Sequence, residues 1–433
     1  MNTRPTNIRH RIIAVSMLMA FILYLDRICL GEIVKSASFK GDVPLSKEQI
    51  GQILGSFFFT YAIFQVPAGW ASDRWGARRM LTCYIVLWSL FTGLTGFMSG
   101  FWGLLLARLG CGIAEAGAYP TSGALIRRWI PQAGRGQASA LVTFGGRIGG
   151  TLAPFLTAWM IVQFGNWRPA LWLDAVVGLG IAAVYFAIVR NRPSEHPECN
   201  DDEQKLIGSP PSEPLPEARE IRPMLRAFCQ SRNLWLNSIA QLFVNVGWAF
   251  LITWLPTYLA EEMKVEAVAG GRMVTLVLAC GMVGQLAGGW TCDWSVRRFG
   301  LRWGRVVSLG SPLLLAGSAY VICLGVDSAW AIIACCAVVS FSTDLSNPSS
   351  WAFMQDIGGK NTASAAGWAN MWGNFGAAAC AMMVPWLLRI GGDGEAGQRL
   401  VFIACAGAFF LAALTVLGMD ATKVIVVKTE TTT

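Results

Sequence analysis

Long apolar stretches separated by short polar segments make up most of this chain. Each stretch holds about 20 residues or more, the length that a helix needs to cross a bilayer core of about 30 Å. The stretches are continuously apolar and do not alternate, which is typical of membrane helices and not of barrel strands. We predict twelve spans: residues 12–33, 50–71, 80–100, 102–126, 137–162, 169–189, 233–260, 268–291, 305–324, 329–354, 363–388 and 399–418.

A polar segment, residues 190–232, separates the first six spans from the last six. Its middle, GSPPSEPLPE, predicts no regular structure, whereas its end, PMLRAFCQSRNLW, predicts a short interfacial helix. The sequence therefore predicts an all-α membrane protein with twelve transmembrane helices in two pseudo-symmetric six-helix bundles. The bundles would be residues 1–189 and 233–433, joined by a cytoplasmic linker of residues 190–232.

Three short motifs of the first half recur in the second half in the same order. The pairs are AGWASD (68–73) with GGWTCD (288–293), GRGQASA (134–140) with GKNTASA (359–365), and GGRIGG (145–150) with WGNFGA (372–377). The offsets, 220, 225 and 227 residues, are nearly constant. Six-helix halves in parallel repeat are an organisation of secondary transporters whose substrate site lies between the halves near the midplane of the bilayer.

The composition agrees with a membrane protein, since 14% of the residues are charged, against about 25% in soluble domains. Of the 34 Lys and Arg residues, 23 lie on the side of the two termini and eight on the other side. The positive-inside rule then predicts cytoplasmic termini in a cell inner (plasma) membrane. The net charge of +8 reflects this bias and does not require a nucleic-acid partner.

Metal-site and disulfide chemistry are not expected. Most of the twelve cysteines lie in or at the edge of apolar stretches, where Cys acts as a small hydrophobe. The two histidines, His10 and His196, lie outside the predicted spans, and no CxxC pair is present. We also find no cofactor motif or activated nucleophile, so an enzyme is not predicted.

GWASDRWGARR (69–79) resembles the cytoplasmic loop signature of the major facilitator superfamily. The resemblance implies a gating motif in which Gly69 allows close helix packing. Asp73 would pair with a basic group and latch the halves in one state, with Arg74 and Arg78 around the turn. Alternatively, these arginines only set the topology.

A longer region, RLGCGIAEAGAYPTSGALIRRWIPQAGRGQASA (108–140), is similar to the anion:cation symporter family of that superfamily. This family includes sialin, the vesicular glutamate transporters and bacterial hexonate and hexuronate permeases. Further similar segments are YLDR on the first span, WLPTYL (254–259) and DIGGKNTASAAGWANMWGNFG (356–376). The resemblance covers nearly the whole chain except its tails and linker.

Asp26 and Arg27 lie side by side inside the first span, where a charge costs about 2.5–3.5 kcal/mol on insertion scales. Neighbouring residues on a helix do not face each other, so the two charges can serve different purposes. Tyr24 and Arg27 share one face, which we expect to line the cavity with the guanidinium offered to a carboxylate. Asp26 would point toward a neighbouring helix.

Arg108 and Glu115 are seven residues apart, two turns along one helix face. Asp26 and Glu115 are the obvious proton carriers, because no histidine lies within the spans. The family resemblance implies the same: the acidic residues couple protons, and Arg27 holds the substrate carboxylate. The alternative is a static network in which Asp26, Arg108 and Glu115 hold helices together.

Three further polar positions resemble substrate-facing positions of the family, and each has a packing alternative. They are Tyr61 on the second span and Asn370 and Asn374 on one face of the eleventh. Arg147 departs from the family, which has an uncharged residue there more often. An extra cavity arginine suggests a more anionic substrate, such as a dicarboxylate; alternatively, Arg147 pairs with Asp344 or Asp174.

These observations predict a monomeric, proton-coupled symporter that imports a small organic anion, most readily a sugar acid, by rocker-switch alternating access. Its partners would be the anion, protons and the lipid bilayer, with no cofactor. Two alternatives remain: an exporter or exchanger of an organic anion or drug, and a non-transporting membrane sensor on the same fold.

Overall fold

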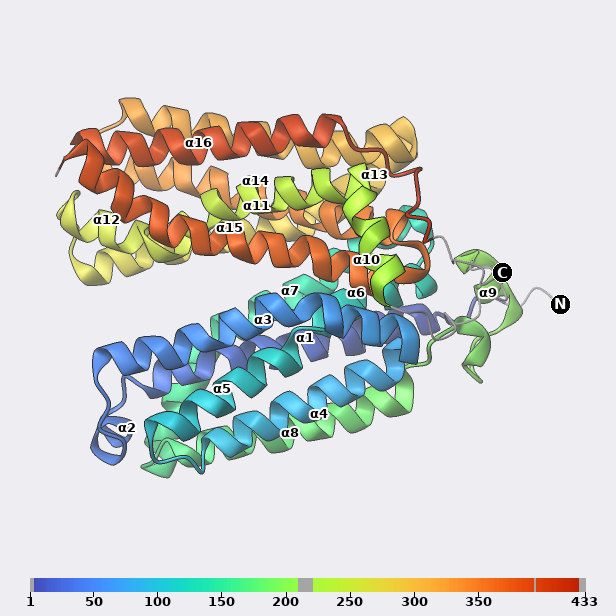
Figure 1. Ribbon diagram of the computed structural model, residues 1–433, viewed down its shortest axis with the longest axis horizontal. Coiled ribbons are helices and arrows are strands. Elements are labelled where there is room, and N and C mark those ends of the chain that lie inside the picture. Colours follow the sequence, from blue (N-terminus) through green and yellow to red (C-terminus); the bar gives the residue numbers. More distant parts are fainter. Residues whose placement is uncertain (1–3, 209–220, 393–394, 428–433) are drawn as a thin grey trace. The chain divides into compact units, whose positions relative to one another are not determined.

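The computed structural model describes residues 4–208, 221–392 and 395–427. The proline-rich middle of the linker, from residue 209, lies outside these ranges. The α-helices are α1 (Ile8–Ile33), α2 (Ala37–Asp42), α3 (Lys47–Trp75), α4 (Ala77–Thr95), α5 (Phe101–Glu115), α6 (Ala118–Trp129), α7 (Arg135–Phe164), α8 (Arg168–Ile188), α9 (Asp201–Ile207), α10 (Ile221–Gln230), α11 (Arg232–Thr253), α12 (Leu255–Glu261), α13 (Ala267–Ile322), α14 (Ala329–Ile357), α15 (Thr362–Gly391) and α16 (Glu395–Leu417) (Figure 1).

Every predicted span falls mainly within helix, so the all-helical membrane fold is confirmed. Among the described residues, nine helical segments are long and apolar enough to cross a membrane, judged by length and composition. One of these, Val268–Gly325, contains two predicted spans. The spans 80–100 and 137–162 correspond to α4 and α7, which do not meet the same criterion.

Helix breaks account for the differences between predicted spans and observed helices. The span 102–126 is divided between α5 and α6 at Ala116 and Gly117. The span 233–260 is divided at Trp254, just before the proline at the start of α12, because proline has no N–H to continue the helix. Within α13, Gly300 has a φ of 74° and a ψ of 174°, which separates two predicted spans at a residue that tolerates positive φ.

The chain forms two compact units. Unit 1 contains Met1–Gln132, Leu141–Ile221 and Lys360–Gly367, and unit 2 contains Ala133–Ala140, Arg222–Gly359 and Trp368–Thr433. Helix α7 therefore begins in unit 2 and continues in unit 1, while α15 begins in unit 1 and continues in unit 2. The exchanged segment 133–140 contains the repeated motif GRGQASA, and the segment 360–367 contains all but the first residue of its counterpart GKNTASA.

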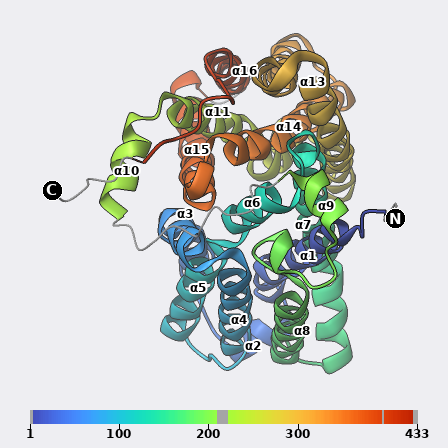
Figure 2. The same ribbon diagram turned by 90° about the vertical axis from the view of Figure 1, so that its right-hand side faces the viewer.

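In unit 1, α8 packs against both α1 and α4, and α5 packs against α3 and α4. Figure 2, which looks along many of these helices, shows α4 and α8 side by side, as does Figure 1. An apolar cluster joins α1 to the start of α8 through Cys29, Ile33, Trp167 and Leu171. The side chains that point from α1 toward α8 are thus held in a packed interior.

In unit 2, α13 packs extensively against α14 and α16, and α11 packs against α16. The Tyr320 hydroxyl donates to the carbonyl of Gly247 at 2.8 Å. The ring of Tyr320 stacks on Phe409 with centroids 5.9 Å apart. A polar tip that finds a backbone acceptor allows this large aromatic ring to be buried at the helix interface.

The first part of the linker docks on the start of α1. Glu203 of α9 is fully buried and accepts hydrogen bonds from the backbone N–H groups of Ile8 and Arg9, both at 3.0 Å. It also accepts from the Thr6 hydroxyl and forms an ion pair with the Arg9 guanidinium at 3.2 Å. Glu203 therefore supplies acceptors for N–H groups that have no partner within α1.

Candidate functional site

The Arg27 side chain on α1 is held by Glu115 at the end of α5. Its Nε and Nη2 atoms donate to the same oxygen, Glu115 Oε2, at 3.0 and 2.8 Å. The Glu115 side chain is 1% exposed and that of Arg27 is 11% exposed. Since Arg27 and Glu115 form a buried, charge-assisted pair, each offsets the desolvation of the other.

Aromatic rings surround the Arg27 guanidinium. Its central carbon lies 4.9 Å from the ring centroid of Tyr24, 4.5 Å from that of Tyr61 and 5.1 Å from that of Phe57. These distances are within the range of cation–π attraction. The structure thus brings the predicted residues Tyr24, Arg27, Tyr61 and Glu115 together in unit 1.

Asp26 and Arg108 lie near this pair but are not joined to it by an ion pair among the described residues. Arg108 is 4% exposed, and its Nη2 donates to the carbonyl of Arg27 at 3.3 Å. Neither carboxylate oxygen of Asp26 has a hydrogen-bond partner in the described ranges. Although Arg108 and Glu115 lie on one helix, it is Arg27 that pairs with Glu115.

Arg147 lies on α7 beside the same aromatic group. The rings of Tyr24 and Tyr119 meet edge to face with centroids 6.2 Å apart. A Cβ placed on Gly146 would lie 2.4 Å from the Tyr119 hydroxyl oxygen and 2.7 Å from Tyr24. Arg147 follows Gly146 directly, so its backbone lies next to the point where α7 contacts Tyr24 and Tyr119.

Asn370 and Asn374 lie in the part of α15 that belongs to unit 2. Both are half-buried, and the Asn374 amide nitrogen donates to the carbonyl of Asn370 at 2.8 Å. Their spacing of four residues places them on one helix face, as the sequence predicts.

Asp73, at the end of α3, accepts hydrogen bonds at the start of α15. The donors are the Ala363 N–H at 3.0 Å, the Ser364 N–H at 2.8 Å and the Ser364 hydroxyl at 2.6 Å. A Cβ on Gly69 would lie 2.5 Å from the carbonyl oxygen of Ala363, so only glycine allows this approach. The donors that hydrogen-bond to Asp73 in this geometry are the N–H groups of a helix start and a hydroxyl, whereas the sequence predicts a basic group as its partner.

The repeat-related residues make the equivalent contacts in unit 2. Asp293 accepts from the N–H groups of Gly136 and Gln137, both at 2.9 Å, at the start of α7. A Cβ on Gly289 would lie 2.6 Å from that of Ala140. The recurrence of Gly and Asp at a constant offset therefore reflects one local structure that is formed twice.

The basic residues of the gating motif surround a glycine turn. Gly76, with a φ of 89°, separates α3 from α4. The Arg78 Nε donates to the carbonyl of Phe186 at 2.9 Å, and its guanidinium lies 4.0 Å from the Phe186 ring centroid. The Arg74 guanidinium lies 5.3 Å from the ring of Trp70. Arg78 thus joins the α3–α4 turn to the end of α8.

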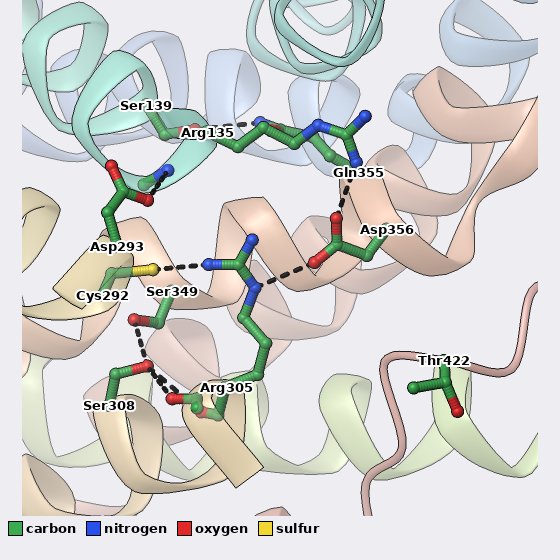
Figure 3. A network of polar contacts seen from close by, with 12 residues as sticks. Arg135, Ser139, Cys292, Asp293, Arg305, Ser308, Ser349, Gln355, Asp356 and Thr422 are labelled. Carbon is green, nitrogen blue, oxygen red and sulfur yellow. Dashed lines mark hydrogen bonds and ion pairs between the residues drawn. The ribbon is translucent and has the colours of Figure 1, made fainter. Parts of the chain in front are cut away.

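A buried ionic network lies next to Asp293 (Figure 3). Asp356 of α14 accepts from Arg305 Nε at 2.8 Å and from Arg135 Nη1 at 2.6 Å. Another nitrogen of Arg305, Nη1, donates to the Cys292 sulfur. The sequence counts Arg305 among the surface charges that set topology, whereas the structure buries it completely. Its partner Asp356 is 51 residues away, which charge counting along the sequence does not detect.

Comparison with known proteins identifies the family. Residues 16–381 match the family model described as "Major Facilitator Superfamily". The chain belongs to the Major Facilitator Superfamily. Its helical fold is that of solved transporters of the superfamily: the TM-score is 0.69 with FucP in the outward conformation, over 93% of this chain and 98% of that one at 14% identity. With the proton:xylose symporter XylE it is 0.70, over 98% of each chain at 16% identity.

Curated relatives in the superfamily are bacterial transporters. The chain is 30% identical to the probable sulfoacetate transporter SauU of Cupriavidus necator, covering 84% of this chain and 83% of the relative. It is 27% identical to the probable galactarate/D-glucarate transporter GudP of Bacillus subtilis, over 95% and 91%. It is also 27% identical to the hexuronate transporter of B. subtilis, over 82% of each chain. These findings confirm the predicted resemblance, and they indicate a multi-pass membrane transporter and not an enzyme.

Sequence reasoning missed two aromatic residues of this superfamily member's candidate site, Phe57 and Tyr119. Phe57 lies four residues before Tyr61, and Tyr119 lies four residues after Glu115. The sequence signal that could have identified Phe57 and Tyr119 is their spacing, because each is an aromatic residue four positions from a predicted site residue. Within the described ranges, no group of three His, Cys, Asp or Glu side chains is placed to hold a metal ion.

Proposed function

We propose that this protein is a proton-coupled secondary transporter that imports a small organic anion, preferably a sugar acid. The observation that carries the proposal is the environment of the Arg27 guanidinium, which contacts the rings of Tyr24, Phe57 and Tyr61 and forms an ion pair with Glu115. A guanidinium fork binds carboxylates in a planar, two-pronged geometry that an ammonium group cannot reproduce. Here an internal carboxylate already occupies that position.

The named substrates of the relatives support an anionic substrate. Sulfoacetate, galactarate, D-glucarate and hexuronates are small molecules with at least one carboxylate. Sulfoacetate and the two aldarates carry two acid groups each. The second positive charge near the site, Arg147, fits such dianions, since desolvating an arginine is best offset by an opposite charge.

We infer that the substrate carboxylate competes with Glu115 for Arg27. When the substrate takes the guanidinium, Glu115 loses its ion-pair partner in a buried site, where the neutral form is favoured. Glu115 then takes a proton, and protonation of Asp26 lowers the remaining buried charge near Arg108. Asn370 and Asn374 would contact substrate hydroxyl groups.

Transport in this proposal follows alternating access. Substrate and proton bind from outside, the protonated state reorients, and deprotonation toward the cytoplasm releases the substrate. The predicted halves, residues 1–189 and 233–433, would move about the linker, with Gly69, Asp73, Arg74 and Arg78 acting as the gating motif. The protein would work as a monomer in the plasma membrane, with both termini cytoplasmic.

The test is uptake by purified protein in proteoliposomes. We expect galactarate, glucarate, a hexuronate or sulfoacetate to accumulate under an inward proton gradient and to show counterflow without one. Arg27→Lys should lose both activities for the same substrate. Counterflow without gradient-driven accumulation would instead identify an exchanger, and no uptake of any organic anion would overturn the proposal.

A further inference from the structure

Five ionisable side chains are buried together around the Arg27–Glu115 pair, and their charges do not balance. The carboxyl groups are Asp26, Glu115 and Asp174, which are 1%, 1% and 5% exposed. The guanidinium groups are Arg27 and Arg108. Glu115 takes Arg27 as its ion-pair partner, which leaves Arg108 as the guanidinium next to Asp26. Two ionised carboxylates beside one guanidinium would leave a negative charge uncompensated in a buried site, which costs several kcal/mol per ion, so the Asp26–Asp174 pair favours holding one proton.

The packing of α1 on α8 shows which carboxyl groups face each other. A Cβ on Gly178 of α8 would lie 4.0 Å from Ile22 of α1. Toward the other end of α1, Ile33 shares an apolar cluster with Trp167, which directly precedes α8. Residue numbers thus rise along α1 while they fall along α8, so the two helices run antiparallel.

Asp26 lies four residues after Ile22, and Asp174 lies four residues before Gly178. Four residues are about one helical turn. Because the helices are antiparallel, Asp26 and Asp174 both lie one turn from the Ile22–Gly178 contact, toward the same end of the helix pair. Asp174 also acts electrostatically on Asp26 and on the neighbouring Cys29. This register places the two carboxyl groups opposite each other across the α1–α8 interface.

Few other polar or charged side chains lie next to the Asp26 and Asp174 carboxyl groups. Oδ2 of Asp174 lacks a hydrogen-bond partner among the described residues, and the polar side chain beside Asp26 that can donate to it is the indole of Trp88. The titratable and charged groups around Asp26 and Asp174 are Cys29 on α1 and Arg108, Cys111 and Glu115 on α5. The near residues of α4 are Trp88 and Ser89, which do not titrate.

We propose that Asp174 is a further proton-handling residue of this transporter: Asp26 and Asp174 share one proton across the α1–α8 interface, and the charge of Asp174 sets how readily Asp26 releases it. Two adjacent carboxyl groups cannot both ionise easily, so their protons leave in two separated steps. Arg108 compensates the single negative charge of the pair, as Arg27 compensates Glu115. This inference rests on the proposed proton coupling.

Asp174→Asn tests the inference, because it removes the charge and nearly preserves the shape. Without that charge Asp26 releases its proton more readily, so the pH midpoint of gradient-driven uptake should move down by about one unit or more. Counterflow at fixed pH should persist. Asp174→Glu keeps the carboxyl group and should give the wild-type profile. Ser89→Ala is the control: Ser89 of α4 contacts α8 at Gly178, one turn from Asp174, and this variant should leave the pH profile unchanged. A wild-type pH profile in Asp174→Asn would overturn the proposal.

An infrared pH titration of the protonated-carboxyl band in the purified protein separates this inference from the proposed function. In the wild type, the band should lose the last proton of the pair at a raised pH, and Asp174→Asn should move that step to lower pH, whether or not uptake is proton-driven. A moved band without proton-driven uptake would refute only the proposed function. If Asp174→Asn does not fold, Asp26→Asn should move the titration of Asp174 in the same direction. An unmoved band would overturn the proposal.

Discussion

The contact between Glu203 and the start of α1 leads to a quantitative prediction. Glu203→Gln replaces one carboxylate oxygen by an NH₂ group, which cannot accept a hydrogen bond. One oxygen accepts from the Ile8 N–H and the Thr6 hydroxyl, and the other accepts from Arg9. The substitution therefore leaves at least one buried donor without an acceptor and removes the negative charge from the helix start.

The magnitude follows from these losses. An unsatisfied buried donor costs about 1–3 kcal/mol, and a charge at a helix N-terminus contributes about 0.3–1 kcal/mol. We expect the local opening free energy to fall by about 1.3–4 kcal/mol, which corresponds to roughly 8- to 700-fold faster amide exchange. The measurement is hydrogen–deuterium exchange of peptides that cover Ile8 and Arg9.

Glu198→Gln is the matched control. Glu198 also pairs with an α1 arginine, Arg11, at 2.7 Å, but the two side chains are 60% and 63% exposed. Exposed pairs contribute about 0–1 kcal/mol, so exchange should change by less than about fivefold. Equal exchange in the Glu203→Gln and Glu198→Gln variants would refute the argument that burial makes the Glu203 contact strong.

The Glu203 contact also predicts how the exchange protection at the start of α1 varies with pH. Burial raises the pKa of Glu203, but hydrogen bonds from Thr6, Arg9 and Ile8 outweigh it and lower that pKa below the ordinary value. A lowered folded-state pKa means that the contribution is fully present above the unfolded value, about 4.3. It is lost as the pH falls through the lower folded value. Exchange protection relative to Glu203→Gln should therefore be constant between pH 6 and 8.

Three further predictions concern the candidate site. Arg27→Lys should fold but lose most substrate binding in a thermal-shift assay, since an ammonium lacks the planar fork; normal uptake by this variant would exclude the clamp. Glu115→Gln and Asp26→Asn should abolish proton-driven accumulation while at least one retains exchange, and accumulation in both would place coupling elsewhere. Arg147→Gln should shift preference from dicarboxylate toward monocarboxylate by about 1–3 kcal/mol in uptake competition; an unchanged order would assign Arg147 to structural pairing.

The amino-acid sequence alone determines where the membrane helices lie and that the second half repeats the first. Span length and apolarity are local properties of the chain, so they can be determined without knowing how the helices pack. The Gly69–Asp73 motif and its copy at Gly289 and Asp293 also belong to the sequence, because each needs glycine for a close approach and a carboxylate within one turn. The sequence also identifies Arg27, because a charge inside an apolar span is costly and therefore indicates a functional or structural role.

Only the tertiary structure decides which partners these residues have. Arg27 pairs with Glu115, 88 residues away, and Asp73 accepts from backbone groups 290 residues away, where the sequence suggested a basic side chain. Helical periodicity gives the face on which a side chain lies but not the helix that covers that face. The proposed pairing of Asp26 with Asp174 and the capping of α1 by Glu203 likewise depend on how α8 and the linker pack, and no local pattern contains that information.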